Sequence, residues 1–97
     1  MSAYWIGRAQ PTDMEGMKRY GQLVAHASTI YPQQALVRGG NHRVLEGPDD
    51  FSRFVLLKFG SMDAALAYYN SPEYQEAAAI RQASCGRCEL VIAEGLD

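Results

Sequence analysis

The stretch FSRFVLLKF, residues 51–59, decides how this chain folds. It is rich in aromatic and aliphatic residues, which is typical of a β-strand. Alternation divides it between two faces, with Val55, Leu57 and Phe59 on one and Phe54, Leu56 and Lys58 on the other. Both faces are largely apolar, so we expect other parts of the protein to cover this strand on both sides.

The segments before and after this strand alternate between strand-like and helix-like patterns. We expect a strand at 3–9, a helix after Thr12 that ends before Pro32, a strand at 34–38 continued by a ribbon at 42–46, the strand at 51–59, a helix at 62–69 that restarts at 73–84, and a strand at 88–94. This β-α-β-β-α-β order predicts one ferredoxin-like α+β domain over residues 1–97, with an antiparallel four-stranded sheet and two helices on one face. A second copy of the sheet is the simplest cover for the other face, which predicts a homodimer.

Residues at the expected helix ends support these boundaries. Thr12 and Glu15 have the spacing of a capping box at the start of the first helix. Ser61 and Ser71 are expected to cap the two later helical segments through their hydroxyl groups. Gly86 is expected to end the last helix in a left-handed conformation.

Composition excludes several classes of function. Apolar residues make up 47% of the chain and the formal net charge is −2, with acidic and basic residues interspersed. The absence of a basic stripe argues against a nucleic-acid partner, and no apolar run is long enough to span a membrane. The N-terminus lacks the pattern of a secretory signal, so we expect a cytoplasmic protein.

Several short segments resemble the bacterial family known as domain of unknown function 1330. They occur in the family's order along nearly the whole chain: Tyr4-Trp5-Ile6, Thr12-Asp13, Arg38-Gly39-Gly40, Val44-Leu45-Glu46-Gly47, Ser71-Pro72-Glu73-Tyr74-Gln75, Ile80-Arg81 and Glu94-Gly95. The resemblance implies a dimeric α+β barrel, in which two sheets pair. It implies no activity, because relatives in the wider superfamily carry out several different reactions.

Two segments depart from the family's pattern. Tyr31-Pro32-Gln33 stands where the family usually has a glycine pair, and Lys58-Phe59-Gly60 stands where it usually has glutamate followed by Phe-Pro. Lys58 therefore reverses the charge of that glutamate. If the glutamate serves a family activity, this protein lacks the group for it.

Arg38, Glu46 and Arg81 are the first candidates for a binding site. Arginine holds a carboxylate through two parallel hydrogen bonds, and a nearby glutamate can orient it or act as a base. A bend at Gly39-Gly40 is expected to bring Arg38 and Glu46 together, near the helix break between Tyr69 and Tyr74. The alternative is an ion-pair network that only fixes the bent strand.

The remaining candidates are weaker. His42 follows the glycine pair and is a candidate because histidine is the side chain suited to proton exchange at physiological pH, although a loop histidine is more often simply solvated. Lys58, Tyr69 and Tyr74 are expected as further polar points of an apolar pocket. His26 lies beside the apolar stripe of the first helix and is expected to have no role.

Cys85 and Cys88 form a C-x-x-C motif. The motif closes a helix and opens a strand, which is the wrong order for a thioredoxin-type site. One such motif supplies two of about four zinc ligands. We therefore expect Cys85 and Cys88 to be reduced thiols in a loop, without a role. The alternative is that they help to bind a zinc ion between the two subunits of a dimer. No cofactor or metal site is predicted, and no residue is assigned a catalytic role.

Two functions remain open at this point. The first is a small-molecule site, with or without cofactor-free enzymatic activity, in the cleft between helices and sheet or inside the barrel. The second is a non-enzymatic domain that serves dimerisation or interaction alone. A pocket with converging charged groups favours the first function, whereas a barrel filled by side chains favours the second.

Overall fold

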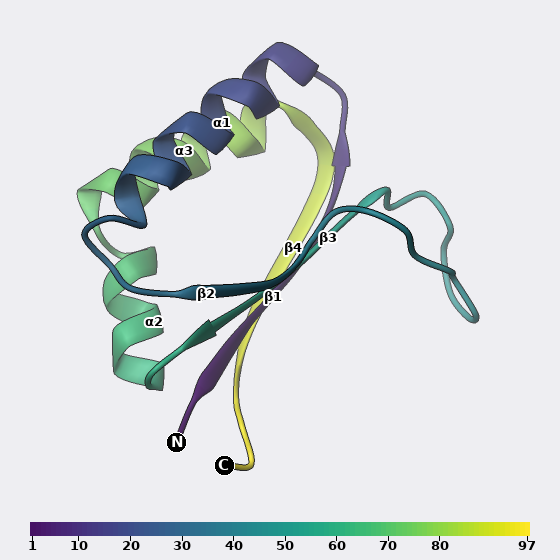
Figure 1. Cartoon of the computed structure of the whole chain (residues 1–97). Helices are drawn as coiled ribbons and strands as arrows, with labels where there is room; N and C mark the ends of the chain where they lie inside the picture. The colour runs from purple at the N-terminus through teal and green to yellow at the C-terminus, as the bar shows by residue number, and fades with distance from the viewer.

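Four strands form one antiparallel sheet in the order β2-β3-β1-β4, and the helices lie on one side of it (Figure 1). The computed structural model describes residues 1–97. Its elements are β1 (Ala3–Pro11), α1 (Met14–Ala27), β2 (Gln34–Arg38), β3 (Arg53–Phe59), α2 (Met62–Tyr69), α3 (Pro72–Ala83) and β4 (Cys85–Glu94). The predicted ferredoxin-like α+β fold is confirmed, and the second helical region is two separate helices.

The strand register divides the sheet into a helix-facing side and an outer side. Trp5 of β1 pairs with Leu57 of β3 and Ile92 of β4, and these side chains face the helices. One position along, Ile6 pairs with Leu56 and Val91 on the outer side. The two faces of the stretch 51–59 are therefore divided as the alternation predicted.

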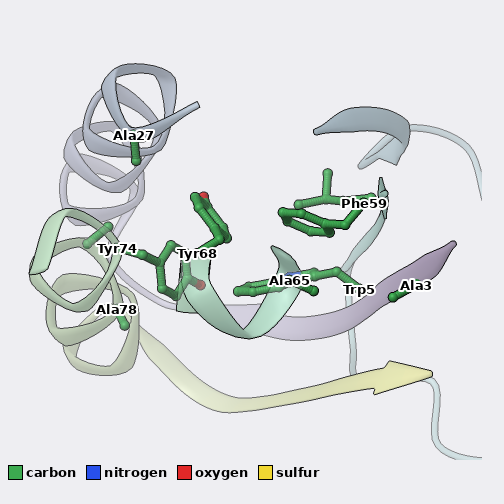
Figure 2. Close-up of a cluster of buried hydrophobic side chains, with 10 residues drawn as sticks. Ala3, Trp5, Ala27, Phe59, Ala65, Tyr68, Tyr74 and Ala78 are labelled. Carbon is green, nitrogen blue, oxygen red and sulfur yellow. The ribbon is translucent and has the colours of Figure 1, made fainter. Parts of the chain in front are cut away.

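Aromatic rings fill the space between sheet and helices. Trp5, Phe59, Tyr68 and Tyr74 are all buried, and alanines from the three helices pack around them (Figure 2). The Trp5 ring lies edge-on to Tyr74 at 4.9 Å between centroids and to Tyr68 at 5.3 Å. Edge-to-face contacts at these distances stabilise a core beyond the area they bury.

The helix starts follow the predictions in two cases out of three. The hydroxyl of Ser61 accepts a hydrogen bond from the Ala64 amide, and that of Ser71 accepts one from Tyr74. The predicted Thr12 capping box is wrong. Asp13 caps α1, accepting from the Gly16 amide at 3.1 Å. The Thr12 hydroxyl instead donates to the Ser84 carbonyl at 3.2 Å, because Thr12 lies beside the end of α3.

Several strand boundaries also differ from the predictions. Residues 42–46 form no strand, and the whole segment 40–50 is exposed and projects beyond the sheet (Figure 1). Gly39 and Gly40 both have positive φ angles, so the chain leaves the sheet at the glycine pair instead of continuing along it. Gly86 has no positive φ, and it lies within β4, which starts three residues earlier than predicted.

Phe51 belongs to the loop and not to the strand that follows it. Its ring is buried between two guanidinium groups, with Arg8 at 4.1 Å and Arg87 at 4.4 Å from its centroid. Cation–π contacts of this kind fasten the end of the projecting loop to the edge of β1 and β4. The strand β3 begins two residues later, at Arg53.

The outer side of the sheet carries exposed apolar side chains. Ile6 is 46% exposed, Val91 59% and Val37 42%, and the partly buried Leu56 lies among them. Single exposed apolar residues are common, whereas this group extends over four adjacent strands. No helix in the protein has both the length and the apolar character needed to cross a membrane.

Candidate functional site

A narrow cavity of about 40 Å³ lies between the sheet and the helices α1 and α3. We call the space the helix–sheet cleft and define it by Trp5, Tyr20, Arg53, Arg81 and Leu90, which line it. A water molecule needs about 15 Å³ measured in the same way, so the cavity itself accepts only a small chemical group.

The cleft continues into hollows at both ends. Arg81 and Leu90 also line an open groove of about 490 Å³ that reaches Tyr69 of α2. Tyr20 and Arg53 also line a hollow of about 180 Å³ that reaches Arg38 at the end of β2. The three spaces share lining residues, so a ligand larger than the central cavity has room to extend in either direction.

A chain of hydrogen bonds connects three side chains at the cleft. The Arg81 Nη1 donates to the Tyr74 hydroxyl at 2.7 Å, and the hydroxyls of Tyr74 and Tyr20 are 3.0 Å apart. Tyr74 is fully buried, so its own hydrogen needs an acceptor, and the Tyr20 oxygen is the one beside it. The Tyr20 hydrogen is then free to be donated into the cleft.

Within this hydrogen-bonded group, the Tyr74 phenol is neutral and the Arg81 guanidinium is charged. Burial raises the pKa of Tyr74 far above its usual value, and the neighbouring Tyr20 adds to that shift. Burial works to lower the pKa of Arg81, but the adjacent Tyr74 and Tyr20 outweigh it, so the net direction is upward. Tyr74 is therefore a hydrogen-bonding group here and not a base.

Positive charge predominates at the cleft. Arg53 and Arg81 line it, whereas Arg8 and the single carboxylate among the lining residues, Glu89, pair with each other at 2.8 Å on strand positions that face the outer side of the sheet. Neither Arg53 nor Arg81 forms an ion pair with a carboxylate. The Arg81 Nε is buried and has no hydrogen-bond partner at all.

The structure brings some of the sequence candidates together. Arg81 and Tyr74 are hydrogen-bonded, and the Tyr69 ring lies 5.8 Å from that of Tyr74. Tyr69 and Arg81 line the same open groove. Arg38 lines the hollow at the opposite end of the cleft, beside Tyr20.

The other candidates lie elsewhere. The His42 ring stacks on Phe54, 4.7 Å between centroids, on the outer side of the sheet. Lys58 also faces outward and lies 4.0 Å from the Asp97 carboxylate. Glu46 is in the exposed loop and forms no ion pair with Arg38. The expected pairing is absent because residues 42–46 leave the sheet instead of folding back along it.

Three residues that shape the cleft were not predicted as site residues: Trp5, Tyr20 and Arg53. Arg53 lies an even number of positions before Val55, Leu57 and Phe59, so its side chain points to the same face of β3. Alternation alone would therefore have placed it on the helix side. Tyr20 was noted only as a member of the apolar stripe on the first helix. Its hydroxyl has a partner only because α1 and α3 pack side by side (Figure 1).

Both cysteines lie on β4: Cys88 within the strand predicted at 88–94, and Cys85 at its earlier start, where a loop had been expected. Cys88 pairs with Ala9 and Cys85 with Pro11, so two residues of β4, Gly86 and Arg87, lie opposite one residue of β1. This bulge gives both cysteines the same facing, toward the helices. Both thiols are free and partly buried, and Cys88 lines the cleft.

The sequence matches the profile of a known family over almost its entire length. The profile of the domain of unknown function DUF1330 covers residues 2–96. This chain belongs to that family. No protein with a curated description matches the sequence.

Several solved structures have a similar fold and low sequence identity to this chain. A dimeric ferredoxin-like protein of unknown function from a Jannaschia species has a TM-score of 0.80 and 18% identity, with 98% of this chain and 100% of that chain covered. A similar dimeric protein from Bacteroides fragilis has a TM-score of 0.68 and 14% identity, with 97% and 96% covered. The hydroxynitrile lyase of Passiflora edulis has a TM-score of 0.73 and 13% identity, with 99% and 95% covered. At these identities the similarity shows a common fold.

Proposed function

We propose that this protein is a homodimer that binds a small carboxylate or carbonyl compound in the helix–sheet cleft of each protomer. The observation that carries the proposal is the state of Arg81. Its guanidinium is partly buried, has no carboxylate partner and holds a buried Nε without an acceptor. A buried charged donor left unpaired is costly, and an oxygen of a bound ligand would supply the missing partner.

Tyr20 provides a second donor for the same ligand. The hydrogen-bond chain from Arg81 through Tyr74 leaves the Tyr20 hydrogen available on the cleft side. A guanidinium and a phenol together suit an oxygen that carries full or partial negative charge. The same donors would stabilise charge that develops on a carbonyl oxygen, so an enzymatic form of this function would need no cofactor.

The apolar residues of the cleft indicate that the part of the ligand away from its polar head is apolar. Trp5, Val55 and Leu90 face the cleft, and the central cavity is narrow. We therefore propose a ligand with a small polar head and a flat or aliphatic remainder that extends into the groove near Tyr69. The hydroxynitrile lyase of similar fold supports only the point that enzymes occur on this fold.

The dimer is supported by the apolar outer side of the sheet. A protomer leaves Ile6, Val37 and Val91 exposed there, and two proteins of similar fold are described as dimeric. Pairing two such faces would bury them together. This face also supports the second candidate function, a domain that serves only dimerisation or interaction. Such a domain would not need an Arg81 whose Nε lacks a hydrogen-bond partner.

Binding can be measured through the single tryptophan, because Trp5 lines the cleft. We expect benzoate or pyruvate to change the Trp5 fluorescence in a saturable way, and benzamide, which has no charge, to bind more weakly than benzoate. Arg81→Gln should weaken benzoate or pyruvate binding by roughly tenfold to a hundredfold, since a hydrogen bond to a charged group contributes about 1.5–3 kcal/mol.

Arg19→Gln is the matched control, because Arg19 is an exposed arginine of α1 whose loss changes the net charge equally. It should bind as the unmodified protein does. If neither acid binds, or if both variants weaken binding to the same extent, the proposed function is wrong and the interaction domain takes its place.

A further inference from the structure

Two sulfur atoms are in contact where β4 begins, and a third sulfur lies nearby. The Cys85 Sγ lies 3.7 Å from the Met17 Sδ, and Cys88 lines the same cavity as Met17. Met17 comes from α1 and the cysteines from β4, so the group exists only in the folded protein. Its geometry depends on the bulge at Gly86 and Arg87, which turns both cysteines toward α1.

We propose that Cys85, Cys88 and Met17 form a binding site for a soft monovalent metal ion, Cu(I). Sulfur ligands about 2.3 Å from one ion stand roughly 3.7–4.0 Å apart in tetrahedral or trigonal geometry, and the Cys85–Met17 separation falls in that range. The pairing of two thiols with a thioether selects Cu(I) over zinc, since zinc sites in proteins use cysteine, histidine and carboxylate ligands.

The charges around the sulfurs suit such an ion. Binding releases the two thiol protons to solvent and leaves the oxidation state of copper unchanged, so the bound complex carries one negative charge. Arg81 and Arg53 both act on the Cys85 thiol and would offset that charge.

The copper site and the proposed ligand site share one cavity but use different atoms. The copper site uses sulfur atoms, whereas the proposed carboxylate site uses Arg81 and Tyr20. Either could fail without the other, because the first is tested with copper and the second with an organic acid.

The experiment is an anaerobic titration of the reduced protein with Cu(I) in competition with the chelator bicinchoninate. We expect one Cu(I) per chain and a thiolate-to-copper absorption band in the ultraviolet. Cys85→Ser and Cys88→Ser should each abolish stoichiometric binding, and Met17→Leu should weaken it by about tenfold or more while preserving the apolar volume.

Met14→Leu is the matched control, because Met14 lies on the same helix with its side chain exposed. It should bind Cu(I) with unchanged affinity. Cys85→Ala and Cys88→Ala replace the serine variants if these do not fold. Failure of the unmodified protein to compete for Cu(I), retention of stoichiometric binding without either cysteine, or equal affinity in the Met17→Leu and Met14→Leu variants would each overturn the proposal.

Discussion

At the scale of single residues, two buried phenols distinguish this core. Tyr68 and Tyr74 are both fully buried, and Trp5 packs against both (Figure 2). The Tyr74 hydroxyl is held by Arg81 and Tyr20, whereas the Tyr68 hydroxyl has no partner within hydrogen-bonding geometry. Burial raises the pKa of Tyr68 to about 12 and that of Tyr74 further.

These shifts predict a loss of stability at alkaline pH. Because the folded-state pKa of each phenol lies above its unfolded value of 10.0, the native state holds both protons more tightly. The stabilisation is complete below pH 10. As the pH rises from there, the Tyr68 contribution is lost toward pH 12, and the Tyr74 contribution declines over the same range and beyond it. Each phenol contributes a slope of about 1.4 kcal/mol per pH unit to the free energy of unfolding.

Urea denaturation between pH 9 and pH 11.5, followed by circular dichroism, measures that slope. Tyr68→Phe removes one of the two phenols and should reduce the slope by about half. A free energy of unfolding that stays constant up to pH 11.5 would contradict the assignment of these two tyrosines as buried neutral groups.

At the scale of elements, the close packing of α1 on α3 depends on one glycine. A β-carbon at Gly16 would collide with the Ser84 hydroxyl and come within 3.0 Å of the Ser84 β-carbon. Ser84 is buried and its carbonyl accepts bonds from Thr12 and Asp13, so it has no room to move away. Gly16→Ala should therefore lower the free energy of unfolding by about 1–3 kcal/mol.

Gly21 offers the comparison within the same helix. No atom lies within 4 Å of a β-carbon placed there, and the residue is exposed. Gly21→Ala should raise the free energy of unfolding by about 0.5–1 kcal/mol, because alanine favours a helix interior more than glycine. Equal effects of the two substitutions in urea denaturation would show that α1 and α3 are not in close contact at Gly16.

At the scale of the whole molecule, the proposed dimer makes a specific prediction about the outer side of the sheet. Ile6 lies at the centre of that side, between Leu56 and Val91. Ile6→Glu would place a charge in the paired sheets, where it has no partner, and should convert the dimer to a monomer. Light scattering at micromolar concentration measures the mass.

Met14→Glu is the control, since Met14 is an exposed apolar residue at the start of α1 and is not part of the sheet. This variant should remain a dimer. A monomeric mass for the unmodified protein, or a dimeric mass for Ile6→Glu, would rule out pairing through this face.

The sequence by itself determined the order of elements and the facing of the central strand. Period-two alternation at 53–59 placed Leu57 and Phe59 in the core and Leu56 on the outer side, as the register shows. Ser61 and Ser71 identified two helix starts, because a cap satisfies backbone amides next to it in the sequence. These features depend on neighbouring residues alone.

Tertiary structure decided the site. Arg81 and Tyr74 were recognised in the sequence, but their partner Tyr20 lies 54 positions before Tyr74 and joins them only through helix packing. The bulge that turns Cys85 and Cys88 to one side arises from the pairing of β4 with β1. Arg38 and Glu46 were expected to meet, yet the positive φ angles at Gly39 and Gly40 direct the chain out of the sheet. In each case the outcome depends on contacts between elements distant in the sequence, which no local pattern specifies.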